Sequence, residues 1–437
     1  MTWVASLILL IGGSITLVMI GLPVAVSFLL VNIVGAFTFF GGEGGMRQLV
    51  MNIEDSLSNF GLVSIPLFIL MGELMFHMKL GQRAISAVEI WIGRVPGRLS
   101  LVSVFGGAMF STVSGSSVAT TAFLGAQLLP EMQERKYHPM MSVGPIIGSG
   151  SLAMMIPPSA LAILLAALMN ISAGGLLIAT IIPGLLMALF YAVYLIGACV
   201  MFPHLAPRYE AVQPPLSEKL KITASGLLPI LAILFMVVGL IFLGYASPTE
   251  SAALGAITSA VLGWASGNMT WAAIRTSIEG TVKLSVMMLI IIGVSIAFSQ
   301  ILAFSGATAG LLNFITQFNL PPIALILVMM LILLVLGCFM DNLSMVMVAI
   351  PIFLPLVHAM GLDPIWFAVL LMINMDIANL TPPFGLLLFV MRGVAPPEIT
   401  LKHIYAAAVP FVIIDLIILG MIIGFPELTS WLPSMMR

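Results

Sequence analysis

Charged residues are scarce in this sequence. Only 7% of its 437 residues are Asp, Glu, Lys or Arg, whereas 61% are hydrophobic. A soluble domain of this length cannot bury that much apolar surface in one core, so lipid must surround much of the chain. The net charge of −2 also argues against a nucleic-acid partner, and we expect none.

Cysteines and catalytic motifs are equally rare. The two cysteines, Cys199 and Cys338, lie in apolar segments without the spacing of a metal site. The chain contains neither HExxH nor GxSxG, so a metalloprotease or a serine hydrolase is not indicated. We therefore expect a protein that is not an enzyme.

Long uncharged runs dominate instead. The runs 3–40 and 222–247 contain no Asp, Glu, Lys or Arg, and each is long enough for membrane helices of roughly 20 residues. The sequence predicts an all-α polytopic membrane protein with about ten transmembrane helices. The expected spans are residues 3–20, 22–40, 60–78, 139–170, 175–202, 222–245, 248–267, 284–305, 364–391 and 404–424.

The chain repeats itself at an offset of 225 residues. Pro157-Pro158 recurs as Pro382-Pro383 within a second apolar segment. At the same offset Leu129-Pro130, Gly81 and Pro23 fall on Leu354-Pro355, Gly306 and Pro248. We predict two repeats, residues 1–205 and 222–437, joined by a cytoplasmic linker at 206–221 that is rich in proline and charge.

Two further apolar stretches are predicted to be re-entrant hairpins, at about 99–130 and 320–357. The first is too long for one vertical helix and too short for two crossings, which need roughly 40 residues. Each arm of such a hairpin reaches about 20 Å, near the middle of the bilayer.

The basic residues orient this topology. With the N-terminus in the periplasm, Arg47 and Arg437 face outward and the other lysines and arginines face the cytoplasm, as the positive-inside rule requires. Each repeat then crosses the membrane five times, so the two repeats are inverted. The inward-facing residues are Lys79, Arg83, Arg94, Arg98, Arg135, Lys136, Arg208, Lys219, Lys221, Arg275, Lys283, Arg392 and Lys402.

Polar residues gather where the apolar segments are broken. Irregular backbone at membrane depth must be buried or line a polar cavity. Hydroxyls, amides, freed carbonyls and carboxylates there suit an alkali cation, whereas the N-termini of half-helices suit an anionic substrate. Asp341 is the most informative residue, because a carboxylate at a hairpin tip is costly without a cation, a proton or a partner. Asp415 has no polar neighbours in sequence and receives no role.

A structural interpretation of these residues remains open. Serine and glycine in membrane helices often serve only close helix packing, and proline pairs can be simple kinks. The placement of four polar breaks at matching points of the two repeats favours a transporter, because inverted repeats surround the site in many secondary transporters.

The sequence resembles the large membrane subunit of tripartite ATP-independent periplasmic (TRAP) transporters, the DctM-like family, over nearly its full length. Within Gly148–Ala153 similar proteins more often have Gly-Thr-Leu-Gly, which is a departure in one of the polar breaks. The segments that carry the resemblance are Ser64–Met75, Leu80–Arg83, Ser114–Thr121, Ile156–Ser159, Asn374–Asp376 and Thr381–Gly385.

The resemblance implies a sodium-coupled secondary importer of small organic acids in the bacterial inner membrane, working by an elevator mechanism. It also implies two partners, a periplasmic substrate-binding protein and a separate small four-helix membrane subunit. One Na⁺ site would comprise Ser116, Ser117, Ser149 and Ser151, and a second Asp341, Asn342, Asp376 and Thr381. The substrate would bind between the hairpin tips, at Ser114, Gly115, Pro157, Ser344, Asn374 and Pro382.

The main alternative is a carrier of the divalent-anion/sodium symporter type that works without a binding protein. A second alternative is a passive channel. Dependence on a binding protein separates the first alternative from a TRAP system, and steady conduction without a substrate gradient would indicate the second.

Overall fold

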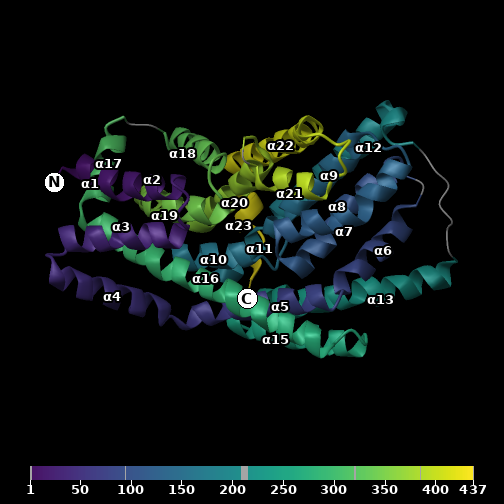
Figure 1. Ribbon diagram of the computed structural model, residues 1–437, viewed down its shortest axis with the longest axis horizontal. Helices are drawn as coiled ribbons and strands as arrows, with labels where there is room; N and C mark the ends of the chain where they lie inside the picture. Colours follow the sequence, from purple (N-terminus) through teal and green to yellow (C-terminus); the bar gives the residue numbers. More distant parts are fainter. Residues whose placement is uncertain (1, 94, 208–214, 319–320, 384, 437) are drawn as a thin grey trace.

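The computed structural model describes residues 2–93, 95–207, 215–318, 321–383 and 385–436, and throughout these ranges the chain is built from helices joined by short turns (Figure 1). Six helices in the described part are long and apolar enough to cross a membrane, or seven if the bent pair α9 and α10 counts as one. The prediction of an all-α polytopic membrane protein is confirmed.

The first part of the chain runs from α1 to α6. Trp3–Met19 is one continuous apolar helix, because η1 links α1 to α2 without a break. The elements are α1 (Trp3–Leu7), η1 (Ile8–Gly12), α2 (Gly13–Met19), α3 (Val24–Phe39), α4 (Glu43–Leu57), η2 (Phe60–Val63), α5 (Ser64–His77) and α6 (Leu80–Ile92).

The next part contains the first predicted hairpin and the first helix break. Helices α7 and α8 pack against each other across a two-residue turn, as a helical hairpin requires. The elements are α7 (Arg98–Ser114), α8 (Ser117–Glu134), α9 (Pro139–Met155), α10 (Ala160–Met169), α11 (Ala173–Ala179), α12 (Ile181–Met201) and η3 (Pro203–Leu205).

The second half follows the same order. Helices α18 and α19 form the second hairpin, and α20 and α21 the second broken helix. The elements are α13 (Leu216–Leu234), η4 (Phe235–Gly239), α14 (Leu240–Phe242), α15 (Pro248–Ala265), α16 (Trp271–Phe304), α17 (Ala307–Thr316), α18 (Pro322–Gly337), α19 (Asn342–Ala359), α20 (Pro364–Leu380), α21 (Leu386–Val394), α22 (Leu401–Gly424), α23 (Glu427–Ser430) and η5 (Pro433–Met435).

Each predicted span falls on a helix or a helix pair in this order. The segment 43–57, to which the sequence assigned nothing, forms α4, whose buried face consists of Gly45 and Leu49. The division into inverted repeats at 1–205 and 222–437 stays a prediction. Residues 208–214 of the linker lie outside the described residues, as do Arg94 and Arg437.

The centre of the fold is formed by α9 and α20. Every residue of α9 from Met141 to Met155 is buried, and α20 is buried from Trp366 to Leu380. Helix α9 packs against α7, α8, α12, α20 and α22. Small residues permit this close packing of helices. A Cβ on Gly144, for example, would lie only 2.7 Å from the carbonyl oxygen of Ala407 in α22, so a larger residue would not fit there.

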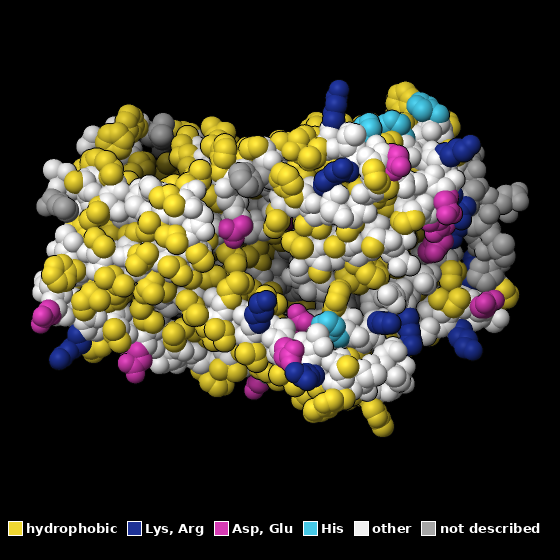
Figure 2. All heavy atoms as spheres, in the orientation of Figure 1, with side chains coloured by type: hydrophobic (Ala, Val, Ile, Leu, Met, Phe, Trp, Pro, Cys, Tyr) yellow, Lys and Arg dark blue, Asp and Glu magenta, His cyan; other side chains and the backbone are white. Residues whose placement is uncertain are grey.

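The space-filling view shows where the few charges lie. Lys and Arg side chains gather mainly over the half of this face that holds α6, α12 and α13, whereas hydrophobic side chains cover much of the remainder (Figures 1 and 2). The basic end therefore contains the connections that the topology assigned to the cytoplasm.

Candidate functional site

Each double proline lies directly after the end of a central helix. Helix α9 ends at Met155 and α10 begins at Ala160, with a bend of 42° between them. Pro157-Pro158 and Pro382-Pro383 are both cis. Ser159 caps α10 by accepting a hydrogen bond from the backbone N–H of Ala162 at 3.3 Å. Both helix breaks predicted from the sequence are therefore present, although Gly385 before α21 makes no side-chain cap of this kind.

The turn of the first hairpin lies against the first break. Gly115 adopts the left-handed conformation, with φ of 58°, and a Cβ there would lie 3.8 Å from the carbonyl oxygen of Pro158. Ser116 caps α8, its Oγ accepting from the N–H of Ala119 at 3.3 Å. The hydroxyl groups of Ser114 and Thr120 are 2.7 Å apart. Three predicted residues thus shape the turn itself, with the N-terminus of α8 beside the break.

The turn of the second hairpin is organised by Asp341. Its carboxylate accepts hydrogen bonds from the backbone N–H groups of Leu343 at 3.1 Å and Ser344 at 3.4 Å, and from the Ser344 hydroxyl. Asp341 is exposed, whereas Ser344 is fully buried. The acid is the N-cap of α19, which gives it a structural role beside any role in ion binding.

The second hairpin tip, α9 and α20 meet at Met154. The side-chain amides of Asn342 and Asn379 lie 3.8 Å and 4.0 Å from its sulfur. Asn342 starts α19, Met154 is near the end of α9, and Asn379 is near the end of α20. The hairpin tip and the ends of both broken helices therefore share one place in the molecule.

The serines of α9 face different neighbours. The Ser149 hydroxyl donates to carbonyl oxygens of its own helix, those of Pro145 and Ile146, and its Cβ is next to Gly107 of α7. The Ser151 hydroxyl donates to the carbonyl oxygen of Gly148 at 2.8 Å and lies 3.5 Å from the hydroxyl of Tyr191. The two residues do not share a polar contact in the described part of the chain.

Close packing holds the first hairpin to α9. A Cβ on Gly150 would overlap the Thr121 hydroxyl and would lie 3.2 Å from the carbonyl oxygen of Ser117. Ser117 is therefore near α9 through its backbone. Of the first predicted Na⁺ site, Ser116 and Ser117 lie at the turn, whereas Ser149 and Ser151 lie on two other faces of α9.

Most of the remaining predicted residues lie in α20 or directly after it. The Asn374 amide donates to the carbonyl oxygen of Met330 in α18 at 2.8 Å, and Thr381 donates to that of Ile377 at 2.6 Å. Asp376 is fully buried, and neither of its carboxylate oxygens has a hydrogen-bond partner. Among the predicted substrate contacts Pro157 is buried and Pro382 is exposed.

A cavity of about 850 Å³ lies between α4, α5 and α16 on one side and α10 and α19 on the other. None of the predicted site residues lines it. Its polar lining includes Ser295, Ser299 and Gln300 of α16. In the sequence, the spacing of these three residues along one face of an expected span could have indicated a polar lining. The predicted site residues came from the helix breaks and hairpin turns instead. Further polar lining comes from Asp55, Ser56, Asn59, Ser64, Asn170, Ser172, Thr249, Thr308 and His358.

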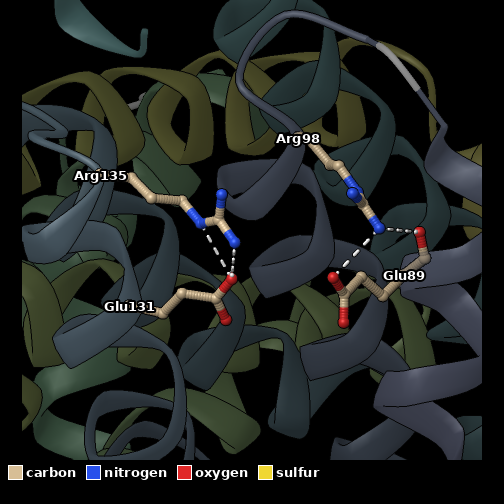
Figure 3. Close-up of polar contacts among 4 residues, drawn as sticks. All are labelled: Glu89, Arg98, Glu131 and Arg135. Atoms are coloured by element: carbon tan, nitrogen blue, oxygen red, sulfur yellow. Dashed lines mark hydrogen bonds and ion pairs between the residues drawn. The ribbon is translucent and has the colours of Figure 1, made fainter. Parts of the chain in front are cut away.

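An ion-pair group joins α6 to the first hairpin at the basic end. Arg98 donates to the Glu89 carboxylate at 3.0 Å, and Arg135 donates to Glu131 at 2.9 and 2.7 Å. Figure 3 shows the two carboxylates facing the space between the pairs. Burial, together with the charge of Glu131, raises the pKa of Glu89 despite the two arginines. The Arg98–Glu89 pair fastens α6 to α7 at the base of the hairpin, whereas the Arg135–Glu131 pair lies at the end of α8.

The chain matches one protein family across residues 11–428, described as "Tripartite ATP-independent periplasmic transporter, DctM component". Among curated proteins it is 29% identical to the C4-dicarboxylate TRAP transporter large permease of Pseudomonas aeruginosa, covering 89% of this chain and 90% of that protein. It is 27% identical to the sialic acid TRAP large permease of Vibrio cholerae, with 97% of each chain covered. The ectoine TRAP large permease of Halomonas elongata is also 27% identical, over 97% and 98%.

Solved structures agree on the fold. The YdaH transporter of Alcanivorax borkumensis matches with a TM-score of 0.67 at 16% identity, covering 93% of this chain and 98% of that one. MtrF of Neisseria gonorrhoeae matches with a TM-score of 0.65 at 12% identity, covering 93% and 95%. At this identity the likeness concerns architecture alone.

Proposed function

Because the chain belongs to the DctM family of TRAP transporter large permeases, we propose that it imports small organic acids across the bacterial inner membrane by coupling to sodium. The family is a transporter family, which is not an enzyme family. It works with a periplasmic binding protein and a small membrane subunit, and we propose that this chain has both partners. The substrates named for its relatives differ, so the particular acid is left open.

The observation that carries the proposal is the pair of broken helices. Helix α9 gives way to α10, and α20 to α21, at a proline pair; the first break bends the chain by 42°, and the turn of the first hairpin lies against it. Interrupted helices of this kind expose carbonyl oxygens and helix N-termini inside a membrane protein, where transporters bind ions and anions.

We propose that sodium binds near the hairpin turns. Hydroxyl, amide, carbonyl and carboxylate oxygens are available from Ser116, Asn342, Asp341 and Thr381, and such oxygens suit an alkali cation. A sodium ion beside Asp341 would neutralise its charge, so the loaded domain could move through the membrane at lower electrostatic cost.

We further propose an elevator movement in which the hairpins and broken helices shift against α5 and α16. The 850 Å³ cavity supports this idea, since α10 and α19 form one wall and α5 and α16 the other. Under the topology with a periplasmic N-terminus, this cavity opens on the periplasmic side, where a binding protein would release substrate.

Uptake by the complete system in liposomes tests the function. We expect accumulation of one of three labelled acids, a C4-dicarboxylate, sialic acid or ectoine, only when a sodium gradient, the small subunit and the binding protein are all present. Uptake without the binding protein would instead support a carrier that works alone. Equal uptake with potassium in place of sodium would remove the sodium coupling.

A further inference from the structure

Three phenylalanines from three helices meet near the C-terminal end of α5. The rings of Phe110 in α7 and Phe123 in α8 are stacked, with centroids 4.3 Å apart and planes at 3° to each other. The ring of Phe76 in α5 meets Phe110 edge-on, with centroids 6.1 Å apart and planes at 75°. Phe110 is 3% exposed, whereas Phe76 is 40% exposed. The contact joins α5 to the first hairpin, and we call these three residues the aromatic seal.

Two missing side chains hold the seal close to α6. A Cβ on Gly81, at the start of α6, would lie 2.5 Å from Cδ2 of Phe110. One turn further along α6, Ile85 packs on Gly106 of α7, where a Cβ would lie 3.3 Å from Cγ1 of Ile85. The Phe110 ring therefore occupies the space that Gly81 leaves, and α6 and α7 are packed too closely to part easily.

The seal joins two groups of helices that face each other elsewhere across the 850 Å³ cavity. Helix α5 packs against α15 and α16, and the Ser277 hydroxyl of α16 donates to the carbonyl oxygen of Glu73 in α5 at 3.2 Å. The hairpin of α7 and α8 packs against α9, which continues through the first break into α10. Helix α5 lines the cavity near its start and contacts the hairpin near its end. The two groups are therefore apart at one end and in contact at the other.

One face of α5 connects the cavity to the seal. Ile65, Ile69 and Phe76 are spaced by four and seven residues, which places them on the same face of the helix. Ile65 lines the cavity, and Ile69 is 6% exposed. Under the topology with a periplasmic N-terminus, the cavity end of this face is periplasmic and the Phe76 end is cytoplasmic, next to Lys79. A path along this face from the cavity to the cytoplasm therefore ends at the seal.

The second half of the chain has aliphatic side chains at the corresponding positions. At the offset of 225 residues the three phenylalanines fall on Ile301, Val335 and Val348. Val335 is 52% exposed, and the second hairpin borders the cavity through α19. Large rings thus close the hairpin contact at the end where the two groups of helices touch, and smaller side chains occupy these positions at the end where the cavity separates them.

We propose that the aromatic seal is the cytoplasmic gate of the transport route, closed in this structure, and that Phe76 parts from Phe110 before a substrate leaves towards the cytoplasm. The inference rests on the proposed transport function and names the contact that its elevator movement breaks. The stack of Phe110 on Phe123 lies within the hairpin and moves with it. The edge-on contact of Phe76 is therefore the one that opens, and removal of this ring leaves the hairpin intact.

Labelling of a cysteine behind the seal tests the proposal without substrate or partner proteins. Ile69→Cys places a thiol between the cavity and the seal, and the two native cysteines are buried. In inside-out membrane vesicles, a membrane-impermeant thiol reagent should label this cysteine slowly. Adding Phe76→Ala should raise the rate about two- to tenfold, the size expected for loss of one edge-on ring contact. Phe76→Tyr should keep the slow rate, because it retains the ring.

Phe40→Ala is the matched control. Phe40, at the end of α3, forms a similar edge-on pair with Phe304 of α16, with centroids 4.8 Å apart and planes at 70°, and neither helix belongs to a hairpin. This variant should leave the labelling rate of Ile69→Cys unchanged.

Fast labelling of Ile69→Cys while Phe76 is intact, or an equal rate after Phe76→Ala, overturns the proposal. Ser299→Cys in the cavity should react in right-side-out vesicles, and reaction only in inside-out vesicles would place the cavity on the cytoplasmic side and also overturn it. Because labelling needs no transport, an absence of uptake in liposomes would contradict the proposed function without changing these rates.

Discussion

A carboxylate at the start of a helix can stabilise that helix, bind a cation or do both, and Asp341 is placed for either role. The sequence indicated its chemical importance because a charge was expected at membrane depth. The hydrogen bonds to the backbone of Leu343 and Ser344 were not deducible, since capping depends on where α19 begins. The two roles make different demands on the side chain, so substitutions can separate them.

Asp341→Ala should lower the free energy of unfolding by about 1 kcal/mol, because it removes the N-cap. Asp341→Asn should change that stability little, since asparagine caps about as well as aspartate. If sodium binds there, both variants should lose a saturable rise of melting temperature when NaCl replaces KCl at constant ionic strength. A sodium response in Asp341→Asn equal to that of the wild type would exclude the carboxylate from the ion site.

At the scale of the elements, the contact between α8 and α9 depends on a missing side chain. Gly150 allows the carbonyl oxygen of Ser117 and the hydroxyl of Thr121 to approach α9 directly. The same contact fixes the hairpin turn beside the break at Pro157-Pro158. Packing of this kind explains why glycine follows Ser149 in α9, although the sequence offered both a packing and an ion-binding interpretation.

Gly150→Ala should therefore destabilise the protein by roughly 1–3 kcal/mol through overpacking and should reduce uptake. Gly197→Ala is the matched control, because Gly197 also lies inside a helix, α12, and a Cβ there would meet nothing within 4 Å. That variant should be neutral or gain up to about 1 kcal/mol from helix propensity. The melting temperatures of the two variants, measured by thermal unfolding, test this prediction. Equal melting temperatures would contradict the packing argument.

At the scale of the whole molecule, the helices and their order could be predicted from the sequence, but most contacts between helices could not. Apolar runs and the repeat of Pro157-Pro158 located the spans, both hairpins and both breaks. The hydrogen bond from Tyr191 to Asp415 could not be predicted, because the two residues are 224 positions apart in the chain. The cavity was missed for the same reason, since its walls come from helices far apart in the chain. Contacts of this kind arise only when helices pack.

The prediction at this scale concerns the orientation of the chain in the membrane. Arg47→Cys should react with a membrane-impermeant thiol reagent in intact cells, because α4 is expected in the periplasm and Arg47 is exposed. Lys136→Cys, which is also exposed, should react only after the inner membrane is permeabilised. The native cysteines, Cys199 and Cys338, are both buried, so background labelling should be low. The reverse pattern would invert the topology.

The contact between Met154 and Asn379 has a consequence for the ancestry of the molecule. The two residues are 225 residues apart, which is also the offset between the proline pairs. If the halves descend from one duplicated segment, corresponding positions of the two copies meet at the rotation axis between them. In the ancestor two identical side chains would have faced each other there. Under that descent, divergence would have left a thioether at Met154 and an amide at Asn379, and a chemically symmetric junction would have become a polarised one.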